Sequence, residues 1–281
     1  MATRTVQSKS AEVRLPATLL AVGATGSIGR LVVAEALEQG YRVRALVRDI
    51  GRARRLLPDQ VELVECDVTR LDGLIDAVGD VDAVVFTLGA GSVRGESAKD
   101  VDYAGVRNVL CALGPRKPRI AMMTAIGVTK RTDPRLGAME GHDWKRRAER
   151  LIRVSGAAYT IVRPGWFDYN DNRQHRLVLL QGDTRWASDP SDGVVARHQI
   201  AQVLVNSLAT PAAAYKTVEL VAEQGAATVD FEALFSSAAA DVSGSLDAVK
   251  DRNNMPLTEE PAWVRDELAA FIVSSAPPTE G

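Results

Sequence analysis

Short apolar runs alternate with amphipathic segments along the first two thirds of the chain. Leu19–Val22 is apolar throughout, which is typical of a strand buried on both faces of a sheet. A glycine-rich turn follows, and from Ser27 to Gly40 the apolar residues recur three and four positions apart, which predicts a helix. In residues 41–47 apolar and polar positions alternate, and this pattern predicts a second strand.

The same alternation of elements continues to residue 165. We expect strands at 61–66, 82–89, 119–128 and 158–165, and helices at 71–78, 102–113 and 142–156. Strands that alternate with helices form a parallel sheet covered on both faces, and right-handed crossovers make that sheet doubly wound. The predicted fold class is therefore α/β, a doubly wound parallel sheet of the Rossmann type.

The regular alternation ends after Gly165. Residues 176–186 resemble a hairpin with Gly182-Asp183 at its turn. We also expect helices at 198–208, 229–240 and 259–272, and a strand at 216–223. No linker or repeat is visible, so residues 17–273 are predicted to be one domain, whose irregular last third (about 166–273) forms a small lobe on the substrate side. Residues 1–16 are expected to be a flexible arm and 274–281 a disordered tail.

Composition narrows the class of protein. With 46% hydrophobic residues in 281, the chain can form a large core, and its net charge of −2 weighs against a nucleic-acid partner. No apolar run approaches the ~20 residues that span a bilayer, so we expect no membrane partner. Cys66 and Cys111 form neither a disulfide framework nor a metal pattern and suit the reducing cytoplasm. The first sixteen residues share the Ser, Thr and Arg bias of a transit peptide, but Glu12 and their small number favour a simple arm.

The turn GATGSIG has the properties of a phosphate-binding turn. The amides and the dipole at the start of the helix attract a pyrophosphate, and glycines let the backbone approach it closely. The residues expected to contact the cofactor here are Gly23, Thr25, Gly26, Ser27, Ile28 and Gly29. The spacing is G-x-x-G-x-x-G and not G-x-G-x-x-G, so a tight turn without a ligand is the alternative.

Several motifs together resemble the short-chain dehydrogenase/reductase superfamily, and more narrowly its atypical NmrA-like, NAD(P)H-binding members. The motifs occur in the family's order between Leu19 and Leu208: VGATGSIG, VRALVRD, ECDVT, VDYAGVRNV, TAIGV, KRRAE, YTIVRPG and RHQIAQVLV. The resemblance implies a Rossmann fold that binds a nicotinamide dinucleotide.

Arg48, at the end of the second predicted strand, favours NADP over NAD. NAD-binding proteins usually place an acidic residue there for the ribose hydroxyls, whereas a guanidinium suits the 2′-phosphate of NADP. Asp49 follows directly and leaves NAD as an alternative.

The resemblance assigns further cofactor contacts. It implies that Asp67 and Val68 flank the adenine, and that Leu88 and Gly89 pass beside the ribose and pyrophosphate. It also implies that Pro164 borders the nicotinamide. A helix cap, a loop and a strand terminator are the structural alternatives for these three segments.

The catalytic residues depart from the family's pattern. Typical members combine a Ser with Tyr-x-x-x-Lys, and the resemblance places Thr124 at the Ser and Lys145 at the Lys, which also holds the cofactor. Gly141 stands where the Tyr is expected and has no proton to transfer. The neighbouring His142 titrates near neutral pH and is a candidate acid, although a lone His is more often a surface or capping residue.

Aromatic residues offer further candidates. Tyr103, Tyr159 and Tyr169 could supply a proton from elsewhere in the fold, and nothing in the sequence places them. Trp144 and Trp166 could line a flat substrate pocket or simply pack at the boundary of the lobe.

Three functions are consistent with these residues. The leading hypothesis is an NADP(H)-binding oxidoreductase acting on a small carbonyl, enone or quinone-like substrate, with no metal. The alternative is a non-catalytic NAD(P)H redox sensor that acts through a protein partner. A nucleotide-sugar epimerase or dehydratase ranks lowest, because these enzymes also need the Tyr. Analogy with relatives suggests a homodimer paired through residues 103–113 and 144–154.

Overall fold

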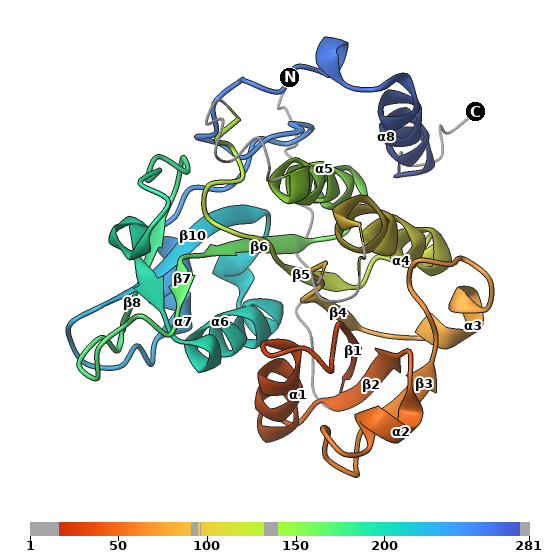
Figure 1. Ribbon diagram of the computed structural model, residues 1–281, viewed down its shortest axis with the longest axis horizontal. Coiled ribbons are helices and arrows are strands. Elements are labelled where there is room, and N and C mark those ends of the chain that lie inside the picture. The colour runs from red at the N-terminus through yellow and green to blue at the C-terminus, as the bar shows by residue number, and fades with distance from the viewer. Residues whose placement is uncertain (1–16, 91–94, 96, 132–139, 276–281) are drawn as a thin grey trace, which may run out of the picture.

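An eight-stranded, mostly parallel sheet forms the centre of the molecule (Figure 1). The computed structural model describes residues 17–90, 95, 97–131 and 140–275. The strands are β1 (Thr18–Val22), β2 (Arg42–Val47), β3 (Glu62–Glu65), β4 (Ala83–Phe86), β5 (Arg119–Met123), β6 (Tyr159–Pro164), β8 (Arg176–Leu180) and β10 (Lys216–Glu223). Their order is β3-β2-β1-β4-β5-β6-β10-β8, and β8 alone of these strands runs antiparallel to its neighbour. The direction of winding reverses between β1 and β4, which is where ligands bind in sheets of this kind.

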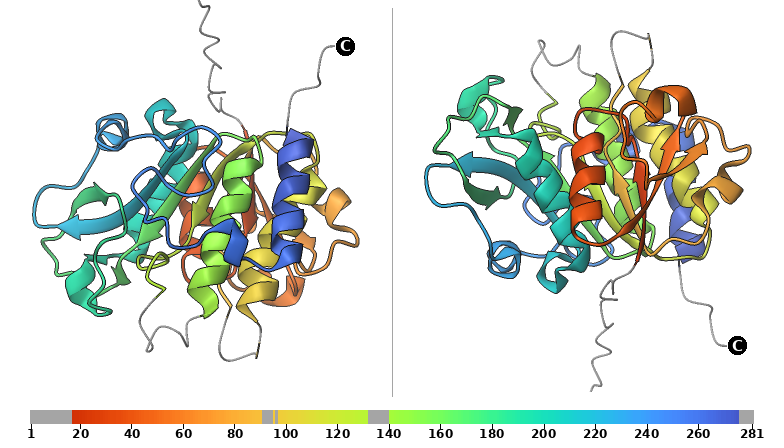
Figure 2. Two further views of the ribbon diagram at one scale, coloured as in Figure 1. Left: turned by 90° about the horizontal axis from the view of Figure 1, so that it is seen from above. Right: turned by 90° about the horizontal axis from the view of Figure 1, so that it is seen from below.

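Helices cover both faces of the sheet, as the sequence predicts. They are α1 (Gly29–Glu38), α2 (Ile50–Ala53), α3 (Leu74–Val78), the π-helix η2 (Lys99–Ala104), α4 (Gly105–Leu113), α5 (Glu140–Val154), α6 (Arg197–Ala209), α7 (Phe231–Ser236) and α8 (Ala262–Ser275), with 3-10 turns η3 (Pro190–Asp192), η4 (Pro211–Ala213) and η5 (Leu257–Glu259). Helices α1 and α6 pack on one face and α3, α4 and α5 on the other, with α8 outside α4 and α5 (Figures 1 and 2). The doubly wound Rossmann-type fold is thus confirmed.

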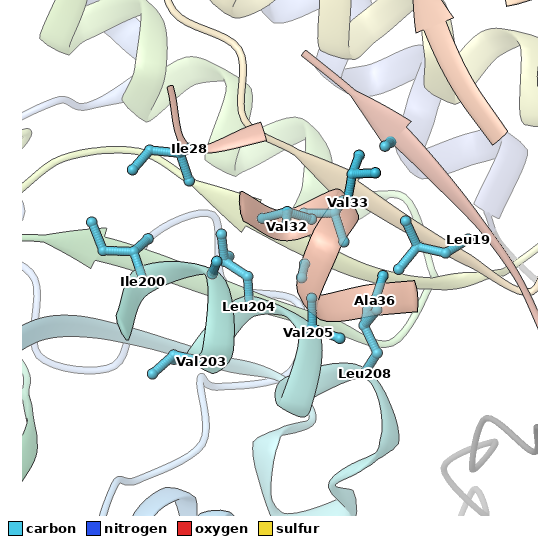
Figure 3. Packing of buried hydrophobic residues seen from close by; sticks show 14 of the residues in the cluster. Leu19, Ile28, Val32, Val33, Ala36, Ile200, Val203, Leu204, Val205 and Leu208 are labelled. Carbon is cyan, nitrogen blue, oxygen red and sulfur yellow. The ribbon is translucent and has the colours of Figure 1, made fainter. Parts of the chain in front are cut away.

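The packing of α1 explains the apolar spacing in its sequence. Ile28, Val32 and Ala36 are buried and point toward the apolar side of α6, where Ile200 and Leu204 are also buried (Figure 3). Burial of such side chains is worth about 1.5–3 kcal/mol each, so this contact holds the glycine turn against the end of β1.

The second face carries an extra layer formed by α8. The rings of Tyr103, Trp144 and Trp263 lie 5.6–5.8 Å apart between centroids, and Trp144 is buried among them. Glu267 of α8 accepts a hydrogen bond from the Tyr103 hydroxyl at 2.6 Å and pairs with Arg107 at 2.7 Å. Trp144 is therefore a packing residue of this layer. The helix face through which relatives were expected to pair is covered by this chain's own α8.

The predicted hairpin at 176–186 is wrong. Strand β8 pairs instead with β10, with Leu180 opposite Glu219, because that long buried strand supplies a complete ladder of partners. Gly182 and Asp183 both have positive φ, as a hairpin turn would require, but here they direct the chain out of the sheet. A separate two-stranded parallel sheet is formed by β7 (Trp166–Phe167) and β9 (Val194–Val195).

Two predicted boundaries also differ. Helix α7 is shorter than the expected 229–240, because the Asp230 carboxylate caps the amide of Ala233 at 2.8 Å and starts the helix there. Helix α8 continues through Ser275, two residues into the segment expected to be a tail. The expected arm at 1–16 and the rest of the expected tail lie outside the described residues.

Candidate functional site

A cleft of about 510 Å³ lies at the carboxyl ends of the first four strands. Its walls come from the glycine turn, the end of β2, the turn after β3 and the turn after β4: Gly23, Thr25, Gly26, Leu46, Val47, Arg48, Asp49, Arg52, Cys66, Asp67, Val68, Thr69, Thr87, Leu88, Gly89 and Val101. Eight residues that the sequence assigned to the cofactor line this cleft: Gly23, Thr25, Gly26, Arg48, Asp67, Val68, Leu88 and Gly89. We call it the cofactor cleft.

The glycine turn fits a phosphate group. Gly23 has φ +92°, and a Cβ there would lie 2.8 Å from the Thr87 carbonyl oxygen. A Cβ on Gly29 would overlap the Gly23 carbonyl, whereas one on Gly26 would meet, among the described atoms, that oxygen alone at 3.2 Å. No side chain caps the start of α1, and the amides of Arg30 and Leu31 donate to the carbonyls of Gly26 and Ile28 at 3.1 and 2.9 Å. A turn whose glycines leave the backbone bare, at the positive end of a helix, is suited to a pyrophosphate.

Ser27 and Ile28 are placed differently from each other. Ser27 is exposed beside the turn, while the Ile28 side chain is buried against α6 (Figure 3). A cofactor contact from Ile28 is therefore restricted to its backbone. Gly29 acts by letting the helix pack on the turn.

The end of β2 presents two cations to the cleft. Arg48 and Arg52 both line it, and the Asp49 carboxylate accepts the Arg52 amide at 2.8 Å as the N-cap of α2. One oxygen of Asp49 is therefore engaged in capping. Arg52, to which the sequence analysis assigns no role, is brought to the cleft by the tight turn into α2.

The turn after β3 is held by its own side chains. Asp67 accepts the amide and the hydroxyl of Thr69 at 3.0 and 2.8 Å, and the Val68 carbonyl accepts the Asn108 amide at 2.9 Å. These bonds fix Asp67 and Val68 in the wall of the cleft. Asp67 thus lines the cleft and closes a local turn, and it does not cap the next helix, α3, whose N-cap is Gly73.

A second pocket, also of about 510 Å³, lies at the carboxyl ends of β5 and β6. It is lined by Ala125, Ile126, Gly127, Lys130, His142, Pro164, Gly165, Trp166, Phe167, Arg185, Trp186, Ala187, Ser188 and Asp192. His142, Pro164 and Trp166, three residues that the sequence singled out, meet here. We call it the second pocket.

Two buried carboxylates hold the loops of the second pocket. Asp183 accepts the amides of Gly127 and Thr129 at 2.6 and 2.8 Å, and Asp192 accepts the amides of Ala187 and Ser188 at 2.7 Å each. Ionised carboxylates bound to several amides are strong acceptors, so the pocket is built on fixed loops.

The ion pair of Lys145 with Asp102 joins α5 to η2, two elements that each contribute a residue to one of the cavities. The other oxygen of the buried Asp102 accepts the Ala90 amide at 3.2 Å. Asp102 is on η2, whose Val101 lines the cofactor cleft, and Lys145 is on α5, one turn after His142 of the second pocket. Sequence reasoning missed Asp102, although it lies in the quoted VDYAGVRNV motif.

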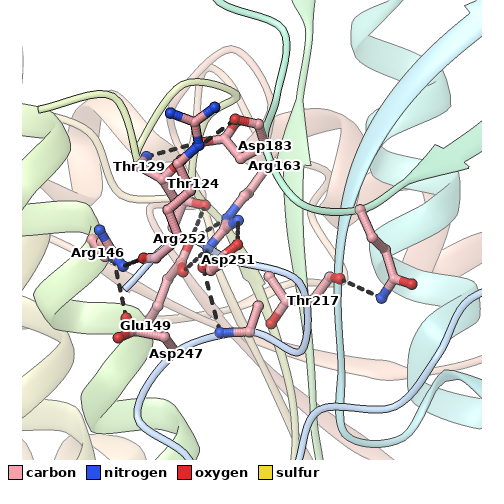
Figure 4. A network of polar contacts seen from close by, with 12 residues as sticks. Thr124, Thr129, Arg146, Glu149, Arg163, Asp183, Thr217, Asp247, Asp251 and Arg252 are labelled. Atoms are coloured by element: carbon pink, nitrogen blue, oxygen red, sulfur yellow. Dashed lines mark hydrogen bonds and ion pairs between the residues drawn. The ribbon is translucent and has the colours of Figure 1, made fainter. Parts of the chain in front are cut away.

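Thr124 does not line either cavity. It is buried and donates its hydroxyl hydrogen bond to Glu149 at 2.7 Å, and Glu149 also pairs with Arg163 at 2.7 Å (Figure 4). Burial raises the pKa of Glu149, but Arg163 and Arg153 outweigh it and lower that pKa to about 2. Thr124 therefore belongs to a buried ionic network, and its hydroxyl proton is engaged by a carboxylate that is ionised at neutral pH.

His142 lies in the second pocket as a neutral ring. Its Nδ1 is 3.3 Å from the Gly127 carbonyl oxygen. Burial lowers its pKa, and the carbonyl contact offsets only part of that effect. With the proton on Nδ1 toward Gly127, Nε2 is an acceptor, so the ring is better suited to take a proton than to give one.

The tyrosines are poor replacements for the missing Tyr of the family's pattern. The hydroxyls of Tyr103 and Tyr159 donate to Glu267 and Asp241, at 2.6 and 3.0 Å, and burial raises the pKa of both phenols. Tyr169 is largely exposed beside the second pocket, its ring edge-on to Trp166 at 6.1 Å.

The described part of the chain contains no group of three or more His, Cys, Asp or Glu side chains arranged to hold a metal ion. None of its described helices is both long and apolar enough to cross a bilayer.

Comparison with known proteins identifies the family. Residues 23–211 match the model of the NAD(P)H-binding family, and the chain belongs to that family. The resemblance to atypical, NmrA-like short-chain dehydrogenases/reductases is thereby confirmed, and the cofactor cleft is the part of the fold that this membership explains.

Proteins and structures similar to this chain agree with this assignment. The chain is 28% identical to Protein TIC 62 of Arabidopsis thaliana chloroplasts, over 88% of this chain and 43% of TIC 62, so it spans less than half of that relative. The oxidoreductase ylbE of Lactococcus lactis matches with TM-score 0.62 at 16% identity, over 78% of this chain and 95% of ylbE. The anaerobillin reductase ChuY of Escherichia coli O157:H7 matches with TM-score 0.59 at 20% identity, over 75% of this chain and all of ChuY. These likenesses show the fold.

Proposed function

We propose that this chain is an NADP(H)-dependent oxidoreductase that reduces a small carbonyl, enone or quinone-like substrate in the second pocket. The observation that carries the proposal is the pair of cavities along one edge of the sheet, to which α5 and η2, joined by the ion pair of Lys145 with Asp102, each contribute a residue. Bound NADPH would supply a hydride for the electrophilic carbon of the substrate. The reductase named among the structures of similar fold supports this reading.

The residues that line the cleft, and Lys145 beside it on α5, have separable tasks in this proposal. The amides after Gly23 and Gly26 hold the pyrophosphate, and Lys145, fixed by Asp102, holds the ribose. Arg48 and Arg52 meet the 2′-phosphate, since guanidinium groups pair with phosphate in a bidentate manner. The engagement of Asp49 with the Arg52 amide favours NADP over NAD.

The proton for the substrate oxygen comes from water in this proposal. Gly141 cannot supply it, the Thr124 hydroxyl is bound to Glu149, and neutral His142 offers an acceptor at Nε2. In the reverse direction, His142 is placed to take the proton of an alcohol, which is the role of a general base.

A second function, a redox sensor that acts through a protein partner, is favoured by one observation. The hydroxyl expected to orient the substrate is buried and bonded to Glu149, and the Tyr is missing, so the cofactor cleft is intact while the acid site is not. A sensor would bind NADPH and NADP⁺ with unequal affinity.

The cellular location stays a proposal. Cys66 and Cys111 are free thiols in the structure, which suits a reducing compartment such as the cytoplasm. The name of TIC 62 places that relative in the chloroplast.

Calorimetric titration with NADPH, NADP⁺ and NADH tests the cofactor. We expect NADPH to bind most tightly and Arg48→Gln to weaken NADPH about tenfold or more, with little change for NADH. Arg54→Gln, an exposed neighbour outside the cleft, is the matched control. Tighter binding of NADH than of NADPH would show that the NADP assignment is wrong.

Turnover separates the two functions. NADPH consumption would be followed with menadione, cinnamaldehyde and their ring-substituted relatives. Oxidation of NADPH that depends on the substrate supports the oxidoreductase. Absence of turnover together with unequal affinities for NADPH and NADP⁺ supports the sensor.

A further inference from the structure

The second pocket combines aromatic walls with positive charge. Trp166, Phe167 and Trp186 supply aromatic surface, while Lys130 and Arg185 supply cations. Among the described residues that line the pocket, Asp192 carries the one carboxylate, and both of its oxygens accept backbone amides of its own loop. The charge of Asp192 is thus occupied within that loop.

Arg185 is the cation available for a ligand. Its guanidinium donates to the Asp192 carbonyl oxygen at 3.2 Å, and no carboxylate of the described chain lies within ion-pair distance of it. Lys130, by contrast, donates to the Trp186 carbonyl. A guanidinium that lines an apolar cavity without an anionic partner is suited to a carboxylate or sulfonate.

Trp186 adds an independent observation. The guanidinium carbon of Arg252 lies 4.0 Å from the ring centroid, while the ring also contributes to the pocket lining. The indole Nε1 is buried and has no hydrogen-bond partner in the described part of the chain. A buried N–H without an acceptor is costly, and a ligand oxygen would satisfy it.

We propose that the second pocket selects a flat, apolar anion, with Arg185 pairing with its carboxylate or sulfonate and Trp186 donating to one of its oxygens. The aromatic walls would contact the ring system of such a molecule, and Arg185 would be the residue that determines specificity. This inference rests on the proposed function, because it names the substrate class of the same pocket.

Two fluorescent probes with the same aromatic rings test the charge preference. 1-Anilinonaphthalene-8-sulfonate is an aromatic sulfonate, and N-phenyl-1-naphthylamine has the same rings without the sulfonate and is neutral. With the cofactor cleft filled by NADP⁺, we expect the anion to bind at least about tenfold more tightly than the neutral probe, as a charge-assisted contact implies.

Variants assign that preference to Arg185. We expect Arg185→Gln to weaken binding of the anionic probe about tenfold and to leave binding of the neutral probe unchanged. Arg185→Lys should restore part of the difference in affinity between the two probes. Trp186→Phe keeps the ring and removes the N–H, so it should weaken the anion alone. Arg173→Gln, an exposed arginine away from the pocket, is the matched control and should change neither probe.

The two proposals fail in different ways. Equal binding of the two probes, or an anion affinity that Arg185→Gln does not change, would overturn the anion preference while leaving NADPH titration untouched. Loss of NADPH binding or turnover would overturn the proposed function while the probe preference remained measurable without cofactor.

Discussion

At the scale of single residues, the glycines of the first turn meet different constraints. Gly29 faces the Gly23 carbonyl, so a side chain there would break the contact between α1 and β1. A Cβ on Gly26 would meet the Gly23 carbonyl oxygen at 3.2 Å, a milder contact, and Gly26 lines the cofactor cleft, so a side chain there would obstruct the ligand more than the fold. The same residue type thus serves packing at one position and binding at another.

This difference predicts opposite effects of two alanine substitutions. Gly29→Ala should lower the free energy of unfolding by about 1–3 kcal/mol, because the Cβ overlaps backbone. Gly26→Ala should change the free energy of unfolding by no more than about 0.5 kcal/mol and weaken the binding of NADPH about tenfold. Urea unfolding and calorimetry measure the two quantities. A Gly26→Ala protein with unchanged NADPH affinity would contradict the placement of the pyrophosphate.

A buried glutamate between the ionic network and the second pocket is a titrating group. Glu219 accepts the Asp183 amide at 3.1 Å and lies 3.5 Å from Arg163. Burial raises the pKa of Glu219 to about 8, because Arg163 is shared with Glu149 and Asp251 and offsets only part of the desolvation. The folded chain therefore retains a proton that an unfolded Glu, with a pKa of about 4.3, releases.

The sign of the pH dependence follows from this raised pKa. The stability that Glu219 contributes is fully present below about pH 4.5 and is lost as the pH rises through about 8. The side chain of Glu219→Gln stays neutral at both pH values. The free energy of unfolding of this variant, relative to that of the wild type, should therefore be higher at about pH 8.5 than at about pH 5.5. Urea unfolding of both proteins at both pH values measures this, and the comparison cancels groups such as His142. An equal difference at the two pH values would contradict the raised pKa.

At the scale of elements, α5 is held by charges that come from far along the chain. Arg146 and Arg150 are fully buried and pair with Asp247, while Arg147 pairs with Glu260 at 2.7 Å (Figure 4 shows Arg146 and Asp247). A buried pair is costly to break from one side, because it leaves an uncompensated charge. The segment between β10 and α8 is thereby fixed to the helix that carries His142 and Lys145.

Helix α8 holds η2 in place in a similar manner, through side-chain contacts between segments far apart in the sequence. Glu267 holds Tyr103 of η2 and Arg107 of α4, and η2 carries the Asp102 that pairs with Lys145. We expect Glu267→Ala to lower the free energy of unfolding by about 1–3 kcal/mol and to speed amide exchange in η2. Chemical unfolding and hydrogen exchange measure these effects. Asp266→Ala, its exposed neighbour, is the control, and equal effects of both substitutions would contradict the role of Glu267.

At the scale of the whole molecule, helix α8 covers α4 and α5, the helices through which two subunits were expected to pair. The aromatic contact of Tyr103, Trp144 and Trp263 and the ion pair of Arg107 with Glu267 occupy that face. A partner subunit could not reach α5 without displacing α8.

We therefore expect the chain not to dimerise through α4 and α5. Sedimentation velocity over a range of protein concentrations measures its mass in solution, and hydrogen exchange at the same concentrations locates any interface. A dimer whose formation protects α4 and α5 further would contradict this expectation, whereas a dimer built on another face would not.

The sequence by itself determined the order of strands and helices, the glycine turn and the residues at strand ends. Periodicity fixes which faces are buried, and in a parallel sheet the carboxyl ends share one edge, so Gly23, Arg48, Asp67 and Gly89 had to meet. These inferences need only local pattern and a general rule of topology.

Tertiary structure alone decided which polar groups pair. Asp102 meets Lys145, Thr124 meets Glu149, and Asp183 meets the loop at 127–129, all between residues far apart in sequence. The same is true of β8, which pairs with β10 and not within a hairpin, and of Trp144, which α8 covers. The local sequence pattern shows that a side chain needs a partner. Which partner it finds, and therefore the free energy of burying that charge or ring, depends on how distant segments of the chain pack together.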